Sequence, residues 1–183
     1  FYELLWRVGV RIVTGPTFSV CNDSAEWPAV QSVLMMSHHH RVMDELFRAG
    51  FTVAPNLYWR RPQDRREWLS WLRDNPSVRM VSRDFSCTTH VSDHGAELGR
   101  LLDLVEAVGR TMHIVVIGVG AGHAQETLTR IGEGGATCSF VTPSPNLMGG
   151  GGERLLISEA GALLRVPSSD GLFETRLHNM RTF

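Results

Sequence analysis

Val78-Arg-Met-Val-Ser-Arg-Asp-Phe-Ser-Cys-Thr-Thr-His90 is the stretch from which the fold can be inferred. It begins as a short apolar strand, Val78 to Val81, and continues as a polar loop that leads into a predicted helix. The same succession of apolar strand, polar loop and helix recurs along the chain. This repetition is typical of parallel β/α construction, in which the carboxyl ends of the strands open onto one shared face.

The other elements follow from hydrophobic periodicity. Short apolar runs predict strands that start near residues 10, 51, 78, 112 and 136. Apolar residues at helical spacing predict helices over 1–8, 28–49, 62–75, 92–108 and 123–131. The strand runs are continuous rather than alternating, as expected when helices cover both faces or when a barrel is filled inside. Beyond Gly152, residues 154–157 and 162–166 fit either two short strands or a helix and a strand.

Two architectures fit this order of elements. An open doubly wound sheet normally carries a glycine-rich nucleotide turn after its first strand, spaced Gly-x-Gly-x-x-Gly. Here the glycines of Gly118-x-Gly120-x-Gly122 follow the fourth predicted strand and lack that spacing. We therefore expect one α/β domain over 1–183, a parallel (β/α) TIM-barrel-like domain with a less defined C-terminal extension at 149–183. Five strands are too few to close an eight-stranded barrel, and the open doubly wound sheet remains the alternative.

Three strand ends carry a resemblance to a known family. They read Val10-Arg-Ile-Val-Thr-Gly-Pro-Thr-Phe-Ser-Val-Cys-Asn-Asp23, Gly50-Phe-Thr-Val-Ala-Pro-Asn-Leu-Tyr-Trp59 and Val81-Ser-Arg-Asp-Phe85. In this order they resemble an uncharacterised domain-of-unknown-function family of bacteria and phages, and the similarity spans Phe1 to Pro145. The resemblance implies a barrel-like β/α fold and no particular activity.

Composition narrows the class of protein. The net charge of -1 creates no overall field that favours nucleic acid or an acidic membrane. The longest apolar runs are far shorter than the roughly 20 residues that a membrane-spanning helix needs. Cys21, Cys87 and Cys138 form no Cys-x-x-Cys pair, which favours a reducing cytoplasm. Because the chain starts at Phe1 inside an amphipathic pattern, we expect a fragment of a longer polypeptide.

Two aspartates are the candidate catalytic residues. Asp84 follows a buried strand, where a carboxylate can act as general base, nucleophile or oxocarbenium stabiliser. Arg83 should point the opposite way, because side chains alternate along extended chain. Asp23 at the first strand end can supply a second carboxylate. Aspartate is also common in turns, so a capping role is an equal alternative for Asp84 and the favoured one for Asn22-Asp23.

Polar, aromatic and glycine residues at the strand ends are the candidate ligand contacts. Tyr58 and Trp59 can stack on a planar or sugar ligand, with a packed aromatic belt beneath the helices as the alternative. The glycine loop before the helix at 123 can present backbone N–H groups to a phosphate, unless it only permits a tight turn. The full set is Asn22, Asn56, Tyr58, Trp59, Gly118, Gly120, Gly122 and Asn146.

The histidines do not form a metal-binding pattern. His38, His39 and His40 are consecutive, so on a helix they diverge by about 100° each and cannot share one ion. His90 and His94 are four residues apart, but no Glu follows His90 as a His-Glu-x-x-His zinc site requires. We predict neither a metal nor a cofactor.

One basic cluster follows the second predicted strand, and it consists of Arg60, Arg61, Arg65 and Arg66. A solvated helix start is the favoured interpretation, and phosphate contact is the alternative.

These residues predict a cytoplasmic barrel enzyme that binds a phosphorylated or nucleotide-like ligand at the carboxyl ends of the strands. Attack on a glycosidic bond through Asp84, by a hydrolase or transferase, is the most specific form, because carboxylates and aromatic platforms suffice for it. The alternative is a non-catalytic module that contacts protein or nucleic acid in a larger or phage-related assembly.

Overall fold

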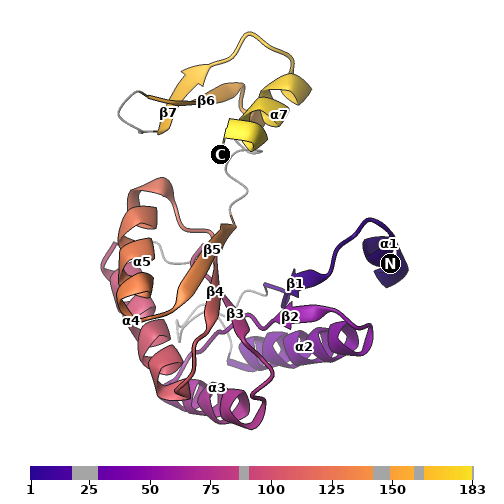
Figure 1. The fold of residues 1–183 in the computed structure, drawn as a ribbon, viewed down its shortest axis with the longest axis vertical. Coiled ribbons are helices and arrows are strands. Elements are labelled where there is room, and N and C mark those ends of the chain that lie inside the picture. Colours follow the sequence, from indigo (N-terminus) through magenta and orange to yellow (C-terminus); the bar gives the residue numbers. More distant parts are fainter. Residues whose placement is uncertain (18–28, 87–90, 142–148, 159–162, 183) are drawn as a thin grey trace. The chain divides into compact units, whose positions relative to one another are not determined.

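The fold is known from a computed structural model that describes residues 1–17, 29–86, 91–141, 149–158 and 163–182 (Figure 1). The chain forms two compact units, Phe1–Val141 and Thr142–Phe183. The second unit contains the extension that the sequence predicts from residue 149. No helix within the described ranges is long and apolar enough to cross a membrane.

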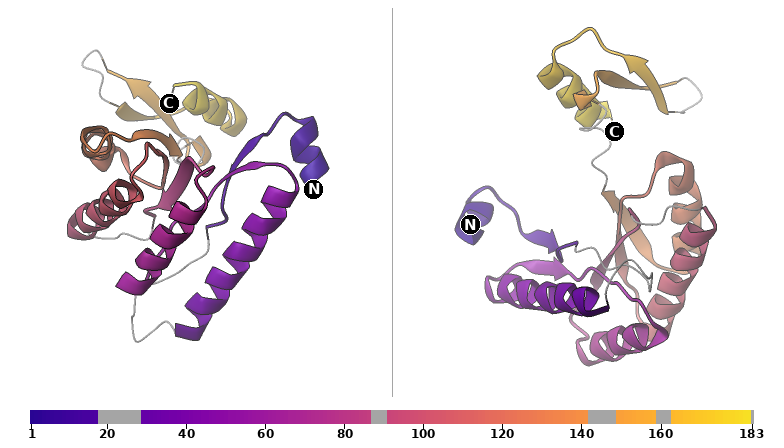
Figure 2. Two further views of the ribbon diagram at one scale, coloured as in Figure 1. Left: turned by 60° about the horizontal axis from the view of Figure 1, so that its bottom comes forward. Right: turned by 180° about the vertical axis from the view of Figure 1, so that it is seen from behind.

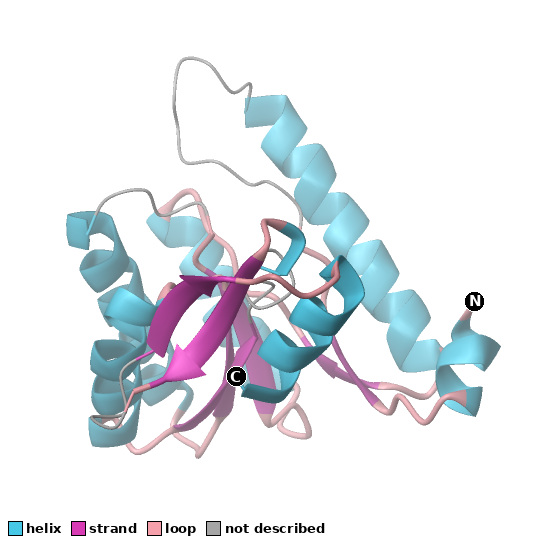
Figure 3. Cartoon of the chain, turned by 90° about the horizontal axis from the view of Figure 1, so that it is seen from above, coloured by secondary structure: helices cyan, strands magenta, loops and turns pink. Residues whose placement is uncertain are grey.

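Strands and helices alternate through the first unit, as predicted. Its elements are α1 (Tyr2–Arg7), β1 (Ile12–Thr14), α2 (Ala29–Arg48), β2 (Thr52–Ala54), α3 (Pro62–Asp74), β3 (Met80–Asp84), α4 (Val91–Val108), β4 (His113–Ile117), α5 (Ala121–Glu133) and β5 (Thr137–Val141). The 20-residue α2 is the long helix in Figure 3. The sequence prediction ended the third strand at Val81, which is wrong, because β3 continues to Asp84.

The strands of the first unit pair in parallel and in the order of the chain. β1 pairs with β2, and β3, β4 and β5 form a second ladder. A bridge between Asn56 and Ser82 joins the two ladders, with hydrogen bonds of 2.7 Å from Leu57 N to Ser82 O and from Ser82 N to Pro55 O. The described strands therefore form an open parallel α/β arrangement and not a closed barrel. Their order does not reverse, as it does in a doubly wound sheet.

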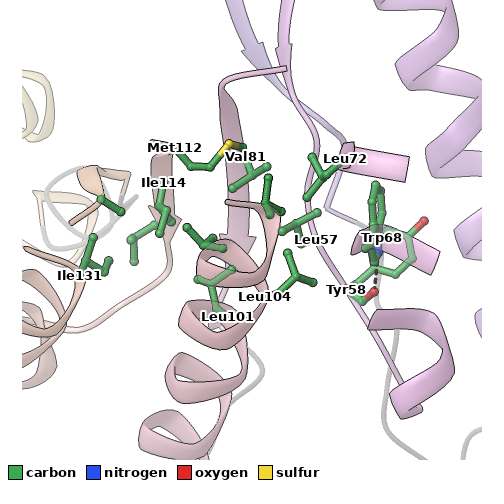
Figure 4. Packing of buried hydrophobic residues seen from close by; sticks show 14 of the residues in the cluster. Leu57, Tyr58, Trp68, Leu72, Val81, Leu101, Leu104, Met112, Ile114 and Ile131 are labelled. Carbon is green, nitrogen blue, oxygen red and sulfur yellow. Dashed lines mark hydrogen bonds between the residues drawn. The ribbon is translucent and has the colours of Figure 1, made fainter. Parts of the chain in front are cut away.

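One face of these strands packs against the helices. Val81, Ile114 and Val116 are fully buried on this face, and α2 to α5 lie around it (Figure 2). Figure 4 shows Leu101 and Leu104 of α4 directed at the strand residues. Fully burying one such leucine contributes about 1.5–3 kcal/mol, so this interface accounts for much of the stability of the unit.

The opposite face is partly open. In β5 exposure alternates, and Thr137, Ser139 and Val141 are exposed while Cys138 and Phe140 are half-buried. The continuous apolar runs predict strands buried on both sides, either under helices on both faces or inside a filled barrel, and β5 does not have this burial. The alternation is the pattern of a strand covered on one side only.

The second unit is a hairpin with one helix. β6 (Glu153–Ile157) and β7 (Leu163–Pro167) are antiparallel, and α7 (Leu172–Thr182) packs against β6. Asn179 ties the helix to the strand, because its side chain accepts from Leu155 N and donates to Glu153 O, both at 2.7 Å. Of the two possibilities for this region, the structure has two strands. The helix was not predicted, because its buried described side chains, Thr175 and Asn179, are polar.

Candidate functional site

Asn56 and Asp84 lie on one face of the sheet at its carboxyl edge. Asn56 is paired in parallel with Ser82, and paired residues point to the same side. Asp84 is two positions beyond Ser82 on β3, so it shares this face as well. Asn56 and Asp84 are 28 positions apart in the sequence, and the strand pairing places them on the same face of the sheet.

One of the two oxygens of the Asp84 carboxylate is hydrogen-bonded within a local turn. Its Oδ1 accepts hydrogen bonds from Ser86 N at 2.8 Å and from Ser86 Oγ at 2.5 Å. This is the turn-capping role that the sequence left as an alternative. Within the described ranges no donor reaches the other oxygen, Oδ2, and the side chain is half-buried. One oxygen is therefore fixed by the turn while the other can accept a proton or a ligand donor.

Gly118 brings the loop after β4 against this turn. Its φ is +74°, and a Cβ atom built there would lie 2.2 Å from Ser86 Oγ and 2.9 Å from Ser86 N. Only glycine fits so close an approach. The Gly118 N–H already donates to Val141 O at 3.1 Å, so this amide is not available to a phosphate as the sequence interpretation supposed.

Gly120 and Gly122 stand at the start of α5. Gly120 is the N-cap residue, and Gly122 is the second residue of the helix, which begins at Ala121 rather than at the predicted 123. A Cβ at either glycine would meet no described atom within 4 Å, so packing does not explain them. The first amides of a helix lack partners within the helix, and an open approach to them suits an anion.

Asn56 is a buried polar residue with an unmatched atom. Its side chain is 3% exposed, and its Oδ1 accepts no hydrogen bond from any described residue. Gly15, in the loop after β1, packs closely here, since a Cβ would lie 2.9 Å from Asn56 N. A buried acceptor without a donor costs about 1–3 kcal/mol, so Oδ1 destabilises the folded state unless a donor reaches it.

Tyr58 and Trp59 lie on the helix side of the sheet, away from Asp84. Tyr58 donates to Met36 O at 3.1 Å, and its burial raises the pKa of the phenol. Trp59 donates from Nε1 to Glu97 Oε2 at 2.8 Å. Both side chains are buried, which is the aromatic belt beneath the helices that the sequence gave as an alternative.

Arg83 points away from Asp84, as predicted. Its Nη2 lies 2.9 Å from Glu97 Oε2, its Nη1 donates to Leu57 O at 2.6 Å, and its guanidinium lies 4.2 Å from the centre of the Trp59 ring. The sequence analysis did not identify Glu97. It could have been found from its spacing, because Glu97 precedes Leu101 by four residues and so lies on the apolar face of α4.

The histidines of the described residues lie in different environments. His39 is fully buried and its Nδ1 lies 2.9 Å from Pro16 O, whereas His38 and His40 are exposed. Burial lowers the pKa of His39 to about 4. His94 stacks on His123 at 4.8 Å between ring centres, and burial, followed by the charge of His123, lowers the pKa of His94.

His113 forms a polar cluster with Thr137 and Ser139 that the sequence analysis did not predict. Its Nδ1 lies 2.8 Å from Thr137 Oγ1 and its Nε2 lies 3.0 Å from Ser139 Oγ, on the partly open face of the sheet. The pairing of β4 with β5 creates this contact, so it depends on register rather than on local sequence.

Six residues that the sequence singled out lie outside the described residues: Cys21, Asn22, Asp23, Cys87, His90 and Asn146. Comparison with known proteins finds no matching family model, no matching curated protein and no matching solved structure.

Proposed function

We propose that the chain binds a small phosphorylated or nucleotide-like ligand at the carboxyl edge of its parallel sheet, with Asp84 as the reacting carboxylate. The observation that carries the proposal is the placement of Asp84 and Asn56 on one face of neighbouring strands at this edge. Ligands of parallel α/β proteins bind at the carboxyl ends of the strands. The unmatched Asn56 Oδ1 supports a ligand that donates a hydrogen bond there.

We further propose that the first unit is part of a (β/α) barrel. Strands that follow one another in the chain are neighbours in the sheet, which is the strand order of a barrel. In a barrel, the partly open face that carries Ser139 would be the interior.

The chemistry proposed for Asp84 uses its two oxygens differently. Ser86 holds Oδ1 and fixes the orientation of the carboxylate, which leaves Oδ2 for proton transfer or for stabilising an oxocarbenium ion. Asn56 would orient the ligand, Asp23 would supply a second carboxylate, and the amides near Gly120 and Gly122 would approach a phosphate. Cleavage or transfer at a glycosidic bond is the reaction class that these groups serve.

Thermal unfolding with nucleotides and sugar phosphates, in the wild type and in Asp84→Asn, tests this proposal. Asp44→Asn is the matched control, because Asp44 is an exposed aspartate on α2 paired with Arg48. We expect one ligand class to stabilise the wild type and the control, and glycosidic turnover to fall by about 10²–10⁴-fold in Asp84→Asn. Ligands that stabilise none of the three proteins, or all three equally without turnover, would refute the proposal.

A second function, a non-catalytic interaction module, is favoured by one observation. The bonds from Ser86 to Asp84 Oδ1 are those of an ordinary turn cap. For a module, Asp84→Asn would lower the unfolding temperature and change no small-molecule affinity. The same thermal experiment therefore separates the two functions.

A further inference from the structure

A cavity of about 340 Å³ lies on the helix side of the first unit. It is formed by the loop after β2, the start of α3 and the middle of α4. The residues lining it are Trp59, Arg60, Arg61, Pro62, Arg65, Glu97 and Arg100. It is distinct from the carboxyl-edge site, because Arg83, which backs this cavity, and Asp84 point to opposite sides of β3.

Positive charge is concentrated around the cavity. Four of its described lining residues are arginines and one, Glu97, is an acid. The Glu97 carboxylate already accepts hydrogen bonds from Trp59, Arg83 and Arg100. It is 5% exposed and therefore serves as a buried anchor rather than as a counter-ion facing the cavity.

Arg65 is the arginine that the described structure leaves available. It is half-buried, lies in the first turns of α3 and makes no hydrogen bond or ion pair with any described residue. Arg65 lines the cavity together with three other arginines, so a ligand that brings negative charge is attracted to it.

The base of the cavity is held in place before any ligand binds. Asp64 Oδ2 accepts from Arg60 N at 2.8 Å and from Arg61 N at 3.2 Å, which fixes the loop at the start of α3. Trp68 Nε1 donates to Tyr58 O at 2.9 Å, a bond drawn in Figure 4. Because the backbone is anchored, little ordering of the loop opposes binding.

We propose that this arginine pocket binds the phosphate group of a small phosphorylated molecule. Guanidinium groups form two parallel hydrogen bonds to phosphate oxygens. The volume falls at the lower end of the roughly 300–1,000 Å³ range of small-molecule pockets, so there is room for more than a bare phosphate. A compact cavity of this size suits a small molecule. A single-stranded nucleic acid would need a continuous groove along its backbone instead.

Titration calorimetry of the full chain with inorganic pyrophosphate, at constant ionic strength, tests the pocket. Three variants are compared with the wild type. Arg65→Gln removes an arginine that has no described partner, Arg66→Gln removes its neighbour, which bonds Gln63 and does not line the cavity, and Asp84→Asn alters the other site. Arg65→Lys keeps the charge and removes the planar fork.

We expect pyrophosphate to bind in the arginine pocket, about tenfold or more weakly in Arg65→Gln, with intermediate affinity in Arg65→Lys and no change in Arg66→Gln. Asp84→Asn should bind pyrophosphate as the wild type does, so failure of the carboxyl-edge proposal leaves this result unaffected. Equal weakening by Arg65→Gln and Arg66→Gln, no binding by the wild type, or tighter binding of a single-stranded oligonucleotide that depends on Arg66 would each overturn the pocket. Far-ultraviolet circular dichroism of Arg65→Gln must match the wild type, and Arg100→Gln, on α4, gives an independent second variant.

Discussion

At the scale of single residues, His39 makes stability depend on pH. Its pKa is about 4 in the folded protein, lowered by burial, against about 6.5 when unfolded. Between these pH values the unfolded chain binds a proton at His39 and the folded protein does not. The free energy of unfolding therefore keeps the full contribution of neutral His39 above pH 6.5 and falls as the pH is lowered toward 4. The loss should amount to roughly 3 kcal/mol, measured by urea unfolding across this range. His39→Gln should lack this part of the pH dependence, and an identical pH profile in both proteins would contradict the assignment.

Gly118 allows the loop after β4 to pack closely against Ser86. Gly118→Ala should destabilise by about 1–3 kcal/mol, because it combines backbone strain with a clash against Ser86. Gly109 is the matched control, with φ +76° and no atom within 4 Å of a built Cβ, so Gly109→Ala incurs strain alone. Urea unfolding should show the larger loss for Gly118→Ala. Equal losses would mean that the loop after β4 does not pack on the turn after β3.

At the scale of elements, α4 is joined to β3 by a buried ion pair. Glu97 and Arg83 have 6% and 12% exposed side chains, so removing one partner leaves a buried charge. Glu97→Leu should destabilise by about 3–5 kcal/mol, and adding Arg83→Met should recover part of that loss, since an apolar pair can replace a buried ion pair. Denaturant midpoints of the single and double variants measure this. A double variant less stable than Glu97→Leu would argue against the pair.

The elements themselves were predictable where burial follows a local apolar period. The helix at 92–108 and the strand at 112–117 were found on this basis, and α4 and β4 match them within one residue at each end. The end of β3 was missed because Arg83 and Asp84 are polar, although one bonds Glu97 and the other lies at the sheet edge. For the site, Asp84 could be chosen from sequence, but its placement on one face of the sheet with Asn56 depends on strand pairing that no local pattern encodes.

At the scale of the whole molecule, the core belongs to one unit. Every residue of the main hydrophobic cluster lies within Phe1–Val141. A chain truncated after Val141 should therefore unfold cooperatively on heating, with a midpoint within a few degrees of the full chain. Calorimetry of the two proteins checks this. A truncated chain without a cooperative transition would show that the second unit is needed for folding.

We propose that the carboxyl edge of the sheet binds a phosphorylated ligand through Asp84 and Asn56. This binding can be followed by the amide chemical shifts of the ¹⁵N-labelled full chain during titration with the nucleotide or sugar phosphate that gives the largest thermal shift. We predict saturable shifts at Asn56, Asp84 and Ser86 that disappear in Asp84→Asn while the shifts around Arg65 persist. Shifts confined to the arginine pocket, or identical shifts in Asp84→Asn, would contradict the claim.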